Sequence, residues 1–111
     1  MVRHYNPWAI INTAGYSNIE EAEKEAEECF TVNSVAPKFL SAVCNKFGIQ
    51  FLTYSSDLVF DGKKNNPYLE SDFVSPLNIF GKSKALAEEN VLNNNPHALI
   101  IRTGAFFGPW D

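Results

Sequence analysis

The sequence lacks several features that define large classes of protein. No apolar run approaches the roughly 20 residues that a membrane-spanning helix needs. The two cysteines, Cys29 and Cys44, form no C-x-x-C pair, and the two histidines, His4 and His97, are far apart, so the sequence predicts no metal site. Nine basic and 13 acidic residues give a net charge of −4, whereas nucleic-acid binding needs a basic surface. These absences argue against a membrane protein, a zinc domain and a nucleic-acid-binding protein.

Two glycine patterns are also missing. The six glycines, at positions 15, 48, 62, 81, 104 and 108, form no G-x-G-x-x-G turn, which complete dinucleotide-binding domains use to bring a helix N-terminus to a pyrophosphate. No G-x-S-x-G nucleophile elbow of a hydrolase is present. Either the first pattern was never part of this protein, or an N-terminal portion is absent from this chain.

What the 111 residues do contain is enough apolar sequence, 45%, for one small folded domain. Short apolar runs alternate with amphipathic stretches, which gives the order β-α-β-α-β. This order predicts an α/β fold with a parallel sheet, right-handed crossovers and helices on the faces of the sheet. We expect strands at 8–11, 49–54 and 98–102, with helices at 17–30, 35–47 and 76–93.

Several residues predict where these helices begin, bend and end. Ser17 and Glu20 have the spacing of a capping box, so we expect Ser17 at the N-cap of the first helix. Pro37 predicts a kink or break in the second helix, and Gly48 predicts its C-terminal end. Pro76 is expected to open the third helix. Cys29 and Cys44 fall within the expected helices and are interpreted as buried structural thiols.

Polar and small residues follow each predicted strand, in the segments 12–16, 55–57 and 103–107. Ligands of open α/β sheets bind beyond the carboxyl ends of the strands. The chemistry is therefore expected where these three segments converge.

At these same segments the sequence resembles the extended short-chain dehydrogenase/reductases, and among them the dTDP-4-dehydrorhamnose reductase family. The order and spacing of the motifs, rather than any single one, carry the resemblance. The matching segments are Ile11–Tyr16 (family N-A-A-x-Y), Glu21–Glu23 (D-x-A-E), Val32-Asn33 (V-N), Ser55–Gly62 (S-T-D-Y-V-F-D-G), Pro67–Glu70 (P-Y-x-E), Pro76–Lys84 (P-x-N-x-Y-G-x-S-K) and Arg102-Thr103 (R-T).

The resemblance implies a Rossmann-like domain that binds NADP or NAD and a nucleotide-sugar substrate. It places Ser56 at the hydroxyl that orients the substrate carbonyl and Lys84 at the cofactor ribose, with Asn33 supporting the lysine through hydrogen bonding or water. By the same resemblance, Asn12, Thr13, Ala14 and Gly15 run beside the cofactor, and Ser56, Asp57 and Tyr16 face the substrate. No metal is implied.

One position departs from the family in a way that affects chemistry. Phe80 occupies the place of the tyrosine that protonates the substrate carbonyl oxygen, and phenylalanine has no proton to give. Loss of a general acid costs roughly 10²–10⁴-fold in rate. Three explanations stay open: a natural non-catalytic relative, an engineered Tyr→Phe change, or an acid moved to Tyr16, Tyr54 or Tyr68. Leu58 also replaces a tyrosine that is commonly placed at the sugar, which puts the substrate in doubt.

Taken together, residues 1–111 are interpreted as one partial NAD(P)-binding Rossmann-like domain, its C-terminal half, without the glycine-rich half and without a substrate domain. We expect a cytoplasmic reductase fragment of dTDP-rhamnose-type biosynthesis that is inactive by itself, or a non-catalytic nucleotide-sugar or dinucleotide-binding or regulatory module. A sheet cut in this way exposes an edge and apolar faces. Self-association, or pairing with the missing part of the domain, is therefore expected.

Overall fold

The computed structural model describes residues 2–104 and contains one parallel sheet with strand order β1-β2-β3. The elements in chain order are α1 (Val2–Tyr5), β1 (Ala9–Asn12), α2 (Ile19–Ala22), α3 (Ala26–Phe30), the π-helical segment η1 (Thr31–Val35), α4 (Ala36–Phe47), β2 (Gln50–Ser56), the 3-10 turn η2 (Asp57–Val59), α5 (Ile79–Asn94) and β3 (Leu99–Thr103). The predicted parallel β-α-β-α-β arrangement is confirmed. The strands lie one or two residues further along the chain than predicted.

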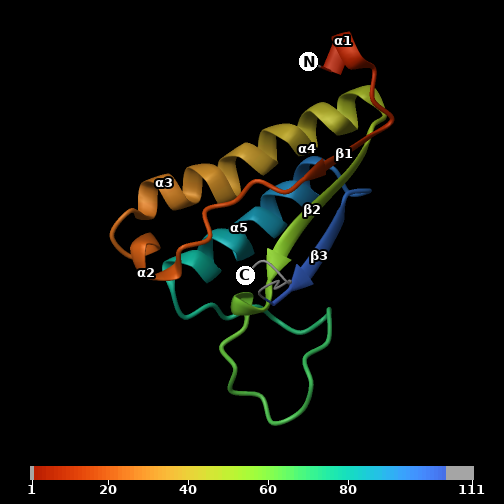
Figure 1. Cartoon of the computed structure of the whole chain (residues 1–111). Helices are drawn as coiled ribbons and strands as arrows, with labels where there is room; N and C mark the ends of the chain where they lie inside the picture. The colour runs from red at the N-terminus through yellow and green to blue at the C-terminus, as the bar shows by residue number, and fades with distance from the viewer. Residues whose placement is uncertain (1, 105–111) are drawn as a thin grey trace, which may run out of the picture.

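Helices α4 and α5 lie side by side against the sheet, and β2 and β3 point toward the end of the molecule where α2 and the long loop after η2 lie (Figure 1). Successive right-handed crossovers that move in one direction place their helices on the same face of a sheet. On that face Phe51, Cys44 and Val91 are buried, with Ile10 and Ile100 packed against them. The alternate strand positions point away from these helices.

Residues on the opposite sheet face and along the β1 edge remain exposed. Ile11 is 61% exposed, and Leu99 and Trp8 are likewise accessible to solvent. Phe39, which continues the predicted four-residue apolar repeat of α4, also faces solvent. The described part of the chain leaves these apolar side chains uncovered.

The predicted first helix is divided, and its cap was wrongly placed. Asn18, not Ser17, is the N-cap of α2: its Oδ1 accepts from the Glu21 amide at 3.0 Å. The helix stops after one turn and resumes as α3. Shifting the cap by one residue lets an Asn side chain reach the third helical amide, an interaction that Asn makes as well as Ser.

Pro37 has the effect that was predicted, although the distortion precedes it. Because proline has no amide hydrogen for the carbonyl four residues earlier, the helix widens into η1 just before α4. Gly48 ends α4 in the left-handed conformation, with φ of 67°, as predicted. Cys29 and Cys44 are both fully buried, also as predicted.

The third helix begins later than Pro76 suggested. Asn78 is its N-cap, and its Oδ1 accepts from the Gly81 amide at 2.7 Å. Gly81 is required here, because a Cβ at this position would lie 2.3 Å from the Leu58 carbonyl oxygen. This close approach places the start of α5 directly against η2, at the end of β2.

No helix within residues 2–104 combines the length and apolar character needed to cross a membrane. Nor do three His, Cys, Asp or Glu side chains gather in this part of the chain in a way that could hold a metal ion.

Candidate active site at the carboxyl ends of the strands

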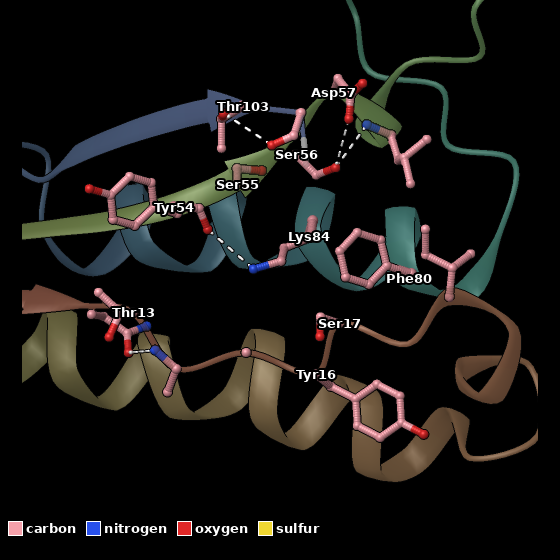
Figure 2. Close-up of a pocket in the computed structure, with 16 residues that line it drawn as sticks. Thr13, Tyr16, Ser17, Tyr54, Ser55, Ser56, Asp57, Phe80, Lys84 and Thr103 are labelled. Carbon is pink, nitrogen blue, oxygen red and sulfur yellow. Dashed lines mark hydrogen bonds between the residues drawn. The ribbon is translucent and has the colours of Figure 1, made fainter. Parts of the chain in front are cut away.

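A cavity of about 610 Å³ lies at the carboxyl ends of the three strands (Figure 2). This volume is in the range of small-molecule sites. Its lining residues are Asn12, Thr13, Ala14, Gly15, Tyr16, Ser17, Ile19, Tyr54, Ser55, Ser56, Asp57, Leu58, Phe80, Lys84, Thr103 and Gly104. All the residues predicted as catalytic, cofactor-binding or substrate-binding therefore line one cavity, and their individual roles stay predictions.

The segment after β1 forms one wall, which we call the β1 wall (residues 12–16). Asn12 donates to Thr53 Oγ1 on β2 at 3.1 Å and accepts from the Ala14 amide at 3.3 Å. Asn33, buried in η1, holds the far end: its Oδ1 accepts from the Tyr16 amide at 2.7 Å and its Nδ2 donates to the Tyr16 carbonyl at 3.0 Å. The same Nδ2 donates to Ser83 Oγ at 3.0 Å.

The expected support of Lys84 by Asn33, through hydrogen bonding or water, stays a prediction. The amide hydrogen bonds of Asn33 go to Tyr16 and Ser83, and Asn33 fastens the β1 wall to η1 and α5. Gly15 lies between the Asn33 amide and the Lys84 ammonium: a Cβ at this position would be 3.5 Å from Asn33 Oδ1 and 3.6 Å from Lys84 Nζ.

The end of β2 forms the second wall, which we call the β2 wall (residues 56–58). Ser56 is buried and caps η2, because its Oγ accepts from the Leu58 amide at 3.0 Å. The same hydroxyl donates to Asp57 Oδ1 at 3.1 Å. To orient a substrate carbonyl, the Ser56 hydroxyl would have to turn its proton from Asp57 toward the cavity.

Helix α5 supplies Phe80 and Lys84, one turn apart on the same face. Phe80 is 9% exposed and packs with Ala22 and Cys29, while part of its ring lines the cavity. Lys84 Nζ donates to the Tyr54 carbonyl at 3.2 Å and lies 5.9 Å from the centre of the Phe80 ring, within cation–π range. Phe80 thus serves both a small apolar core and the wall of the cavity.

Burial lowers the pKa of the Lys84 ammonium from its usual value, and the nearby Cys29 thiol acts in the opposite direction. Among residues 4–104, whose side chains are described, no carboxylate forms an ion pair with Lys84. A partly desolvated ammonium of this kind is well suited to hold an uncharged or anionic oxygen in the cavity.

Of the three phenols considered as replacement acids, Tyr16 is arranged unfavourably, Tyr68 lies in the loop after η2, and Tyr54 lines the cavity. The Tyr16 hydroxyl donates to Glu25 at 3.0 Å, and its ring points away from Lys84 and Ser56 (Figure 2). Partial burial, this hydrogen bond and neighbouring carboxylates raise the pKa of Tyr16 to about 12, which makes it a poor acid near neutrality. The Tyr68 hydroxyl donates to Asp61 in the loop after η2.

Sequence reasoning missed Ser17 and Ile19 as lining residues, and it considered Tyr54 only as a replacement acid. Ser55 lines the cavity as part of the predicted segment 55–57. Ile19, the first residue of α2, lines the same cavity as Phe80. Of the segment 103–107, Thr103 and Gly104 line the cavity, and positions 105–107 lie outside the described residues.

The three-stranded parallel sheet, its helices and the cavity at the strand ends define a Rossmann-like α/β fold. UDP-glucose 4-epimerase from Brucella ovis shares this fold at 20% identity, with a TM-score of 0.78 over 91% of this chain and 33% of the epimerase. Residues 1–110 match the family described as "RmlD substrate binding domain", and the chain belongs to this family.

Curated relatives agree with this assignment. The chain is 34% identical over 110 residues, or 99% of its length, to dTDP-4-dehydrorhamnose reductase of Aggregatibacter actinomycetemcomitans. It is 37% identical over 108 residues, 97% of its length, to the probable low-salt glycan biosynthesis reductase Agl14 of Haloferax volcanii. The chain spans 37% and 36% of these two proteins, so the activity of a whole relative is not transferred to it directly.

A solved dTDP-4-dehydrorhamnose reductase from Bacillus anthracis, in complex with NADP, superimposes with a TM-score of 0.93 at 28% identity. The match covers 99% of this chain and 39% of that one. The family resemblance drawn from the motifs is therefore confirmed.

Proposed function

We propose that the chain is part of an NADP- or NAD-dependent reductase of a nucleotide-linked keto sugar, resembling dTDP-4-dehydrorhamnose reductase. The observation that carries the proposal is the meeting of Ser56, Phe80 and Lys84 in one cavity, at the carboxyl ends of parallel strands, in a member of this family. Residues 1–111 would form the C-terminal half of the dinucleotide-binding domain. A cytoplasmic location is part of the same proposal.

The residues present fit the ribose end of a dinucleotide. Lys84 has three N–H donors, and the Tyr54 carbonyl accepts one of them. The remaining donors, together with the Asn12–Gly15 backbone, would hold ribose hydroxyls. When bound, the nicotinamide supplies the hydride for carbonyl reduction.

The residues of the β2 wall would hold the sugar. Ser56 would donate its hydroxyl proton as a hydrogen bond to the carbonyl oxygen, after releasing Asp57. Leu58, Ile19 and Phe80 present apolar surface beside it. Polar groups on one side and apolar side chains on the other would fix the orientation of a sugar ring with few hydroxyls on one edge.

Phe80 limits the rate of such a reaction. Its ring can exclude water from the reacting carbonyl, but it has no group that can donate a proton to the alkoxide oxygen. We expect reduction to be roughly 10²–10⁴-fold slower than with a phenol at this position.

Phe80 also favours a second candidate function, a binding or regulatory module that keeps the ligand site without catalysis. Phe80 packs on Ala22 and Cys29 as a core residue, so the fold does not depend on a phenol at position 80. In this case the dinucleotide and the nucleotide sugar would both bind, and no reduction would follow.

The test is binding of NADPH and NADH by calorimetry, followed by reduction of a dTDP-4-keto-6-deoxysugar, on this chain and on the full-length product of its gene. Phe80→Tyr should raise the reduction rate by roughly 10²–10⁴-fold. Phe39→Tyr, which adds the same hydroxyl on the exposed side of α4, is the matched control and should change nothing. Binding without any gain from Phe80→Tyr would favour the binding module, and absence of cofactor binding in both forms would refute the proposal.

A further inference from the structure

A half-buried ion pair lies behind the β2 wall. Glu88, one turn beyond Lys84 on α5, accepts from Ser55 Oγ at 2.6 Å. The same carboxylate accepts from Arg102 on β3 twice, from Nε at 3.0 Å and from Nη2 at 2.7 Å. The pair therefore joins α5 to β2 and β3, at the residue that directly precedes Ser56.

Arg102 also reaches the loop that follows η2. Its Nη1 donates to the Glu70 carbonyl at 3.2 Å, and its guanidinium lies 5.0 Å from the centre of the Phe60 ring. Phe60 in turn stacks on Tyr68, with ring centres 4.1 Å apart and an angle of 13°. One guanidinium thus holds both ends of the segment 60–70.

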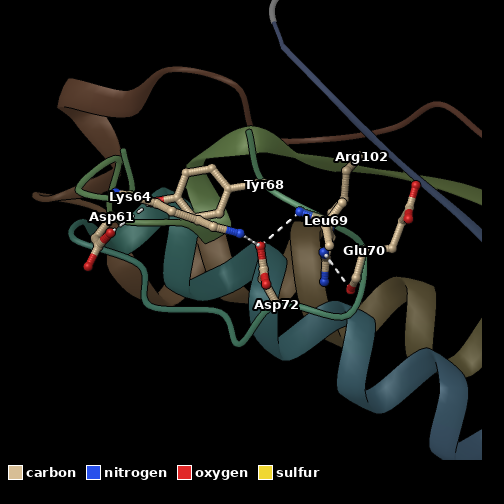
Figure 3. Close-up of polar contacts among 7 residues, drawn as sticks. All are labelled: Asp61, Lys64, Tyr68, Leu69, Glu70, Asp72 and Arg102. Carbon is tan, nitrogen blue, oxygen red and sulfur yellow. Dashed lines mark hydrogen bonds and ion pairs between the residues drawn. The ribbon is translucent and has the colours of Figure 1, made fainter. Parts of the chain in front are cut away.

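Within the loop, polar contacts keep this segment in one shape (Figure 3). Tyr68 donates to Asp61 at 3.0 Å, and Lys64 pairs with Asp72 at 2.5 Å. Asp72 also accepts from the Leu69 amide at 2.8 Å. Two anchors join this loop to the rest of the structure: Arg102, and the Ser75 amide, which donates to the Val59 carbonyl at 2.7 Å. Arg102 is the anchor that joins the loop to the sheet.

The β2 wall is located between these two anchored parts. Ser56 follows Ser55, which Glu88 holds, and Leu58 lies two residues before Phe60, which Arg102 covers. The β1 wall has a different anchor, because Asn33 binds the backbone of Tyr16 on both its amide and its carbonyl. No hydrogen bond or ion pair of Arg102 or Glu88 within residues 2–104 goes to the β1 wall.

We propose that Arg102, through its pair with Glu88, is a positioning residue for the β2 wall, and that it acts independently of Asn33, which positions the β1 wall. The ligand assignment rests on the proposed function, in which the β2 wall meets the nucleotide sugar and Asn12–Gly15 of the β1 wall meet the cofactor, while Tyr16 at the end of the β1 wall is expected at the substrate. The sugar contacts of the β2 wall and the cofactor contacts of the β1 wall would then depend on separate networks in one cavity.

Arg102→Lys tests this division with little change in charge. Lysine keeps the cation but has no planar fork, so it cannot bind Glu88 by two nitrogens and Glu70 by a third. Glu88→Gln is a second variant that leaves Arg102 in place. Asn33→Ala is the matched variant for the β1 wall, because it removes both hydrogen bonds to Tyr16.

The first readout is amide hydrogen exchange and needs no ligand. Arg102→Lys and Glu88→Gln should speed exchange at Leu58 and Leu69 by about fivefold to tenfold, as expected for weakened hydrogen bonds to a charged group. The Tyr16 amide should change less than about twofold, and Asn33→Ala should show the reverse pattern. Similar acceleration at both walls in each variant would overturn the proposal.

The second readout is the affinity of the full-length protein for dTDP-glucose and for NADPH. Arg102→Lys should weaken dTDP-glucose binding by about tenfold and leave NADPH binding within about twofold. If the wild type binds both and Arg102→Lys weakens both equally, the positioning inference is wrong and the proposed function stands. If exchange divides as expected but the wild type binds neither ligand, the proposed function fails and the separate anchoring of the walls stands.

Discussion

Gly81 offers the sharpest test of how the cavity is built, because its missing side chain allows α5 to touch the end of β2. A Cβ built on Gly81 lies 2.3 Å from the Leu58 carbonyl oxygen, and 3.1 Å from both Asn78 Oδ1 and Pro76 Cβ. The first of these contacts is with backbone, which cannot swing aside as a side chain could. In Gly81→Ala, therefore, η2 must move away from α5.

The energetic terms oppose one another and can be weighed. Overpacking of this kind costs about 1–3 kcal/mol. Weakening of the Asn78 cap adds up to about 1 kcal/mol. The higher helix propensity of alanine stabilises the variant by about 1 kcal/mol relative to glycine. These terms sum to a destabilisation of about 0–3 kcal/mol, and the 2.3 Å contact with a backbone oxygen places the expectation at the upper end, about 2–3 kcal/mol. This corresponds to a Tm lower by about 10–15 °C in a domain of this size.

Urea and thermal unfolding followed by circular dichroism would measure this change. Gly104→Ala is the control, because a Cβ there meets nothing closer than Asp57 Oδ2 at 3.7 Å. It should remain within about 0.5 kcal/mol of the wild type. If Gly81→Ala is as stable as this control, the close approach of α5 to η2 does not hold the β2 wall, and the reasoning fails.

Two further predictions concern pH and association. Asp61 accepts a hydrogen bond from the Lys63 amide, and Asp72 accepts one from the Leu69 amide; these bonds hold both carboxyl pKa values below the usual 3.8. The stability that the two carboxylates contribute is therefore complete above that pH and is lost as pH falls through the lowered pKa values. The urea midpoint should accordingly fall with acidification below about pH 4, and it should fall less steeply in Asp72→Asn. Separately, the uncovered β1 edge should cause self-association in sedimentation velocity, which Ile11→Lys should reduce; a monomeric wild type at high concentration would contradict this.

Much of the fold could be predicted from local sequence, because the alternation of apolar runs with amphipathic segments leaves few topologies. The α/β order, the parallel strands and the buried cysteines follow from it. Local sequence did not decide where a helix begins when two nearby residues could each cap or open it. Ser17 and Asn18 can both cap a helix, and the structure uses Asn18. Pro76 can open a helix, but Asn78 binds the amide of Gly81 and sets the start.

The anchors of the site could not be read from sequence, because each joins residues that are distant along the chain. Asn33 holds Tyr16 across 17 positions, and Arg102 meets Glu70 across 32. An arginine at the end of a strand has many possible partners, and only the folded chain selects among them. The family motifs brought the predicted residues to the cavity but did not indicate that Asn33 binds the backbone of Tyr16.

Phe80 shows why a fold and its chemistry can separate at one position. In the reductase family a tyrosine here would place its ring and its hydroxyl in different environments, and the ring alone is enough for packing against Ala22 and Cys29. Removing the hydroxyl therefore costs the fold little, since Lys84 is held by the Tyr54 carbonyl and Ser56 by the Leu58 amide and Asp57. In the proposed function, the groups that would hold the ligands do not depend on a phenol at position 80, whereas proton transfer to the substrate would. Adding one oxygen atom in Phe80→Tyr is therefore sufficient to tell a slow reductase from a binding module.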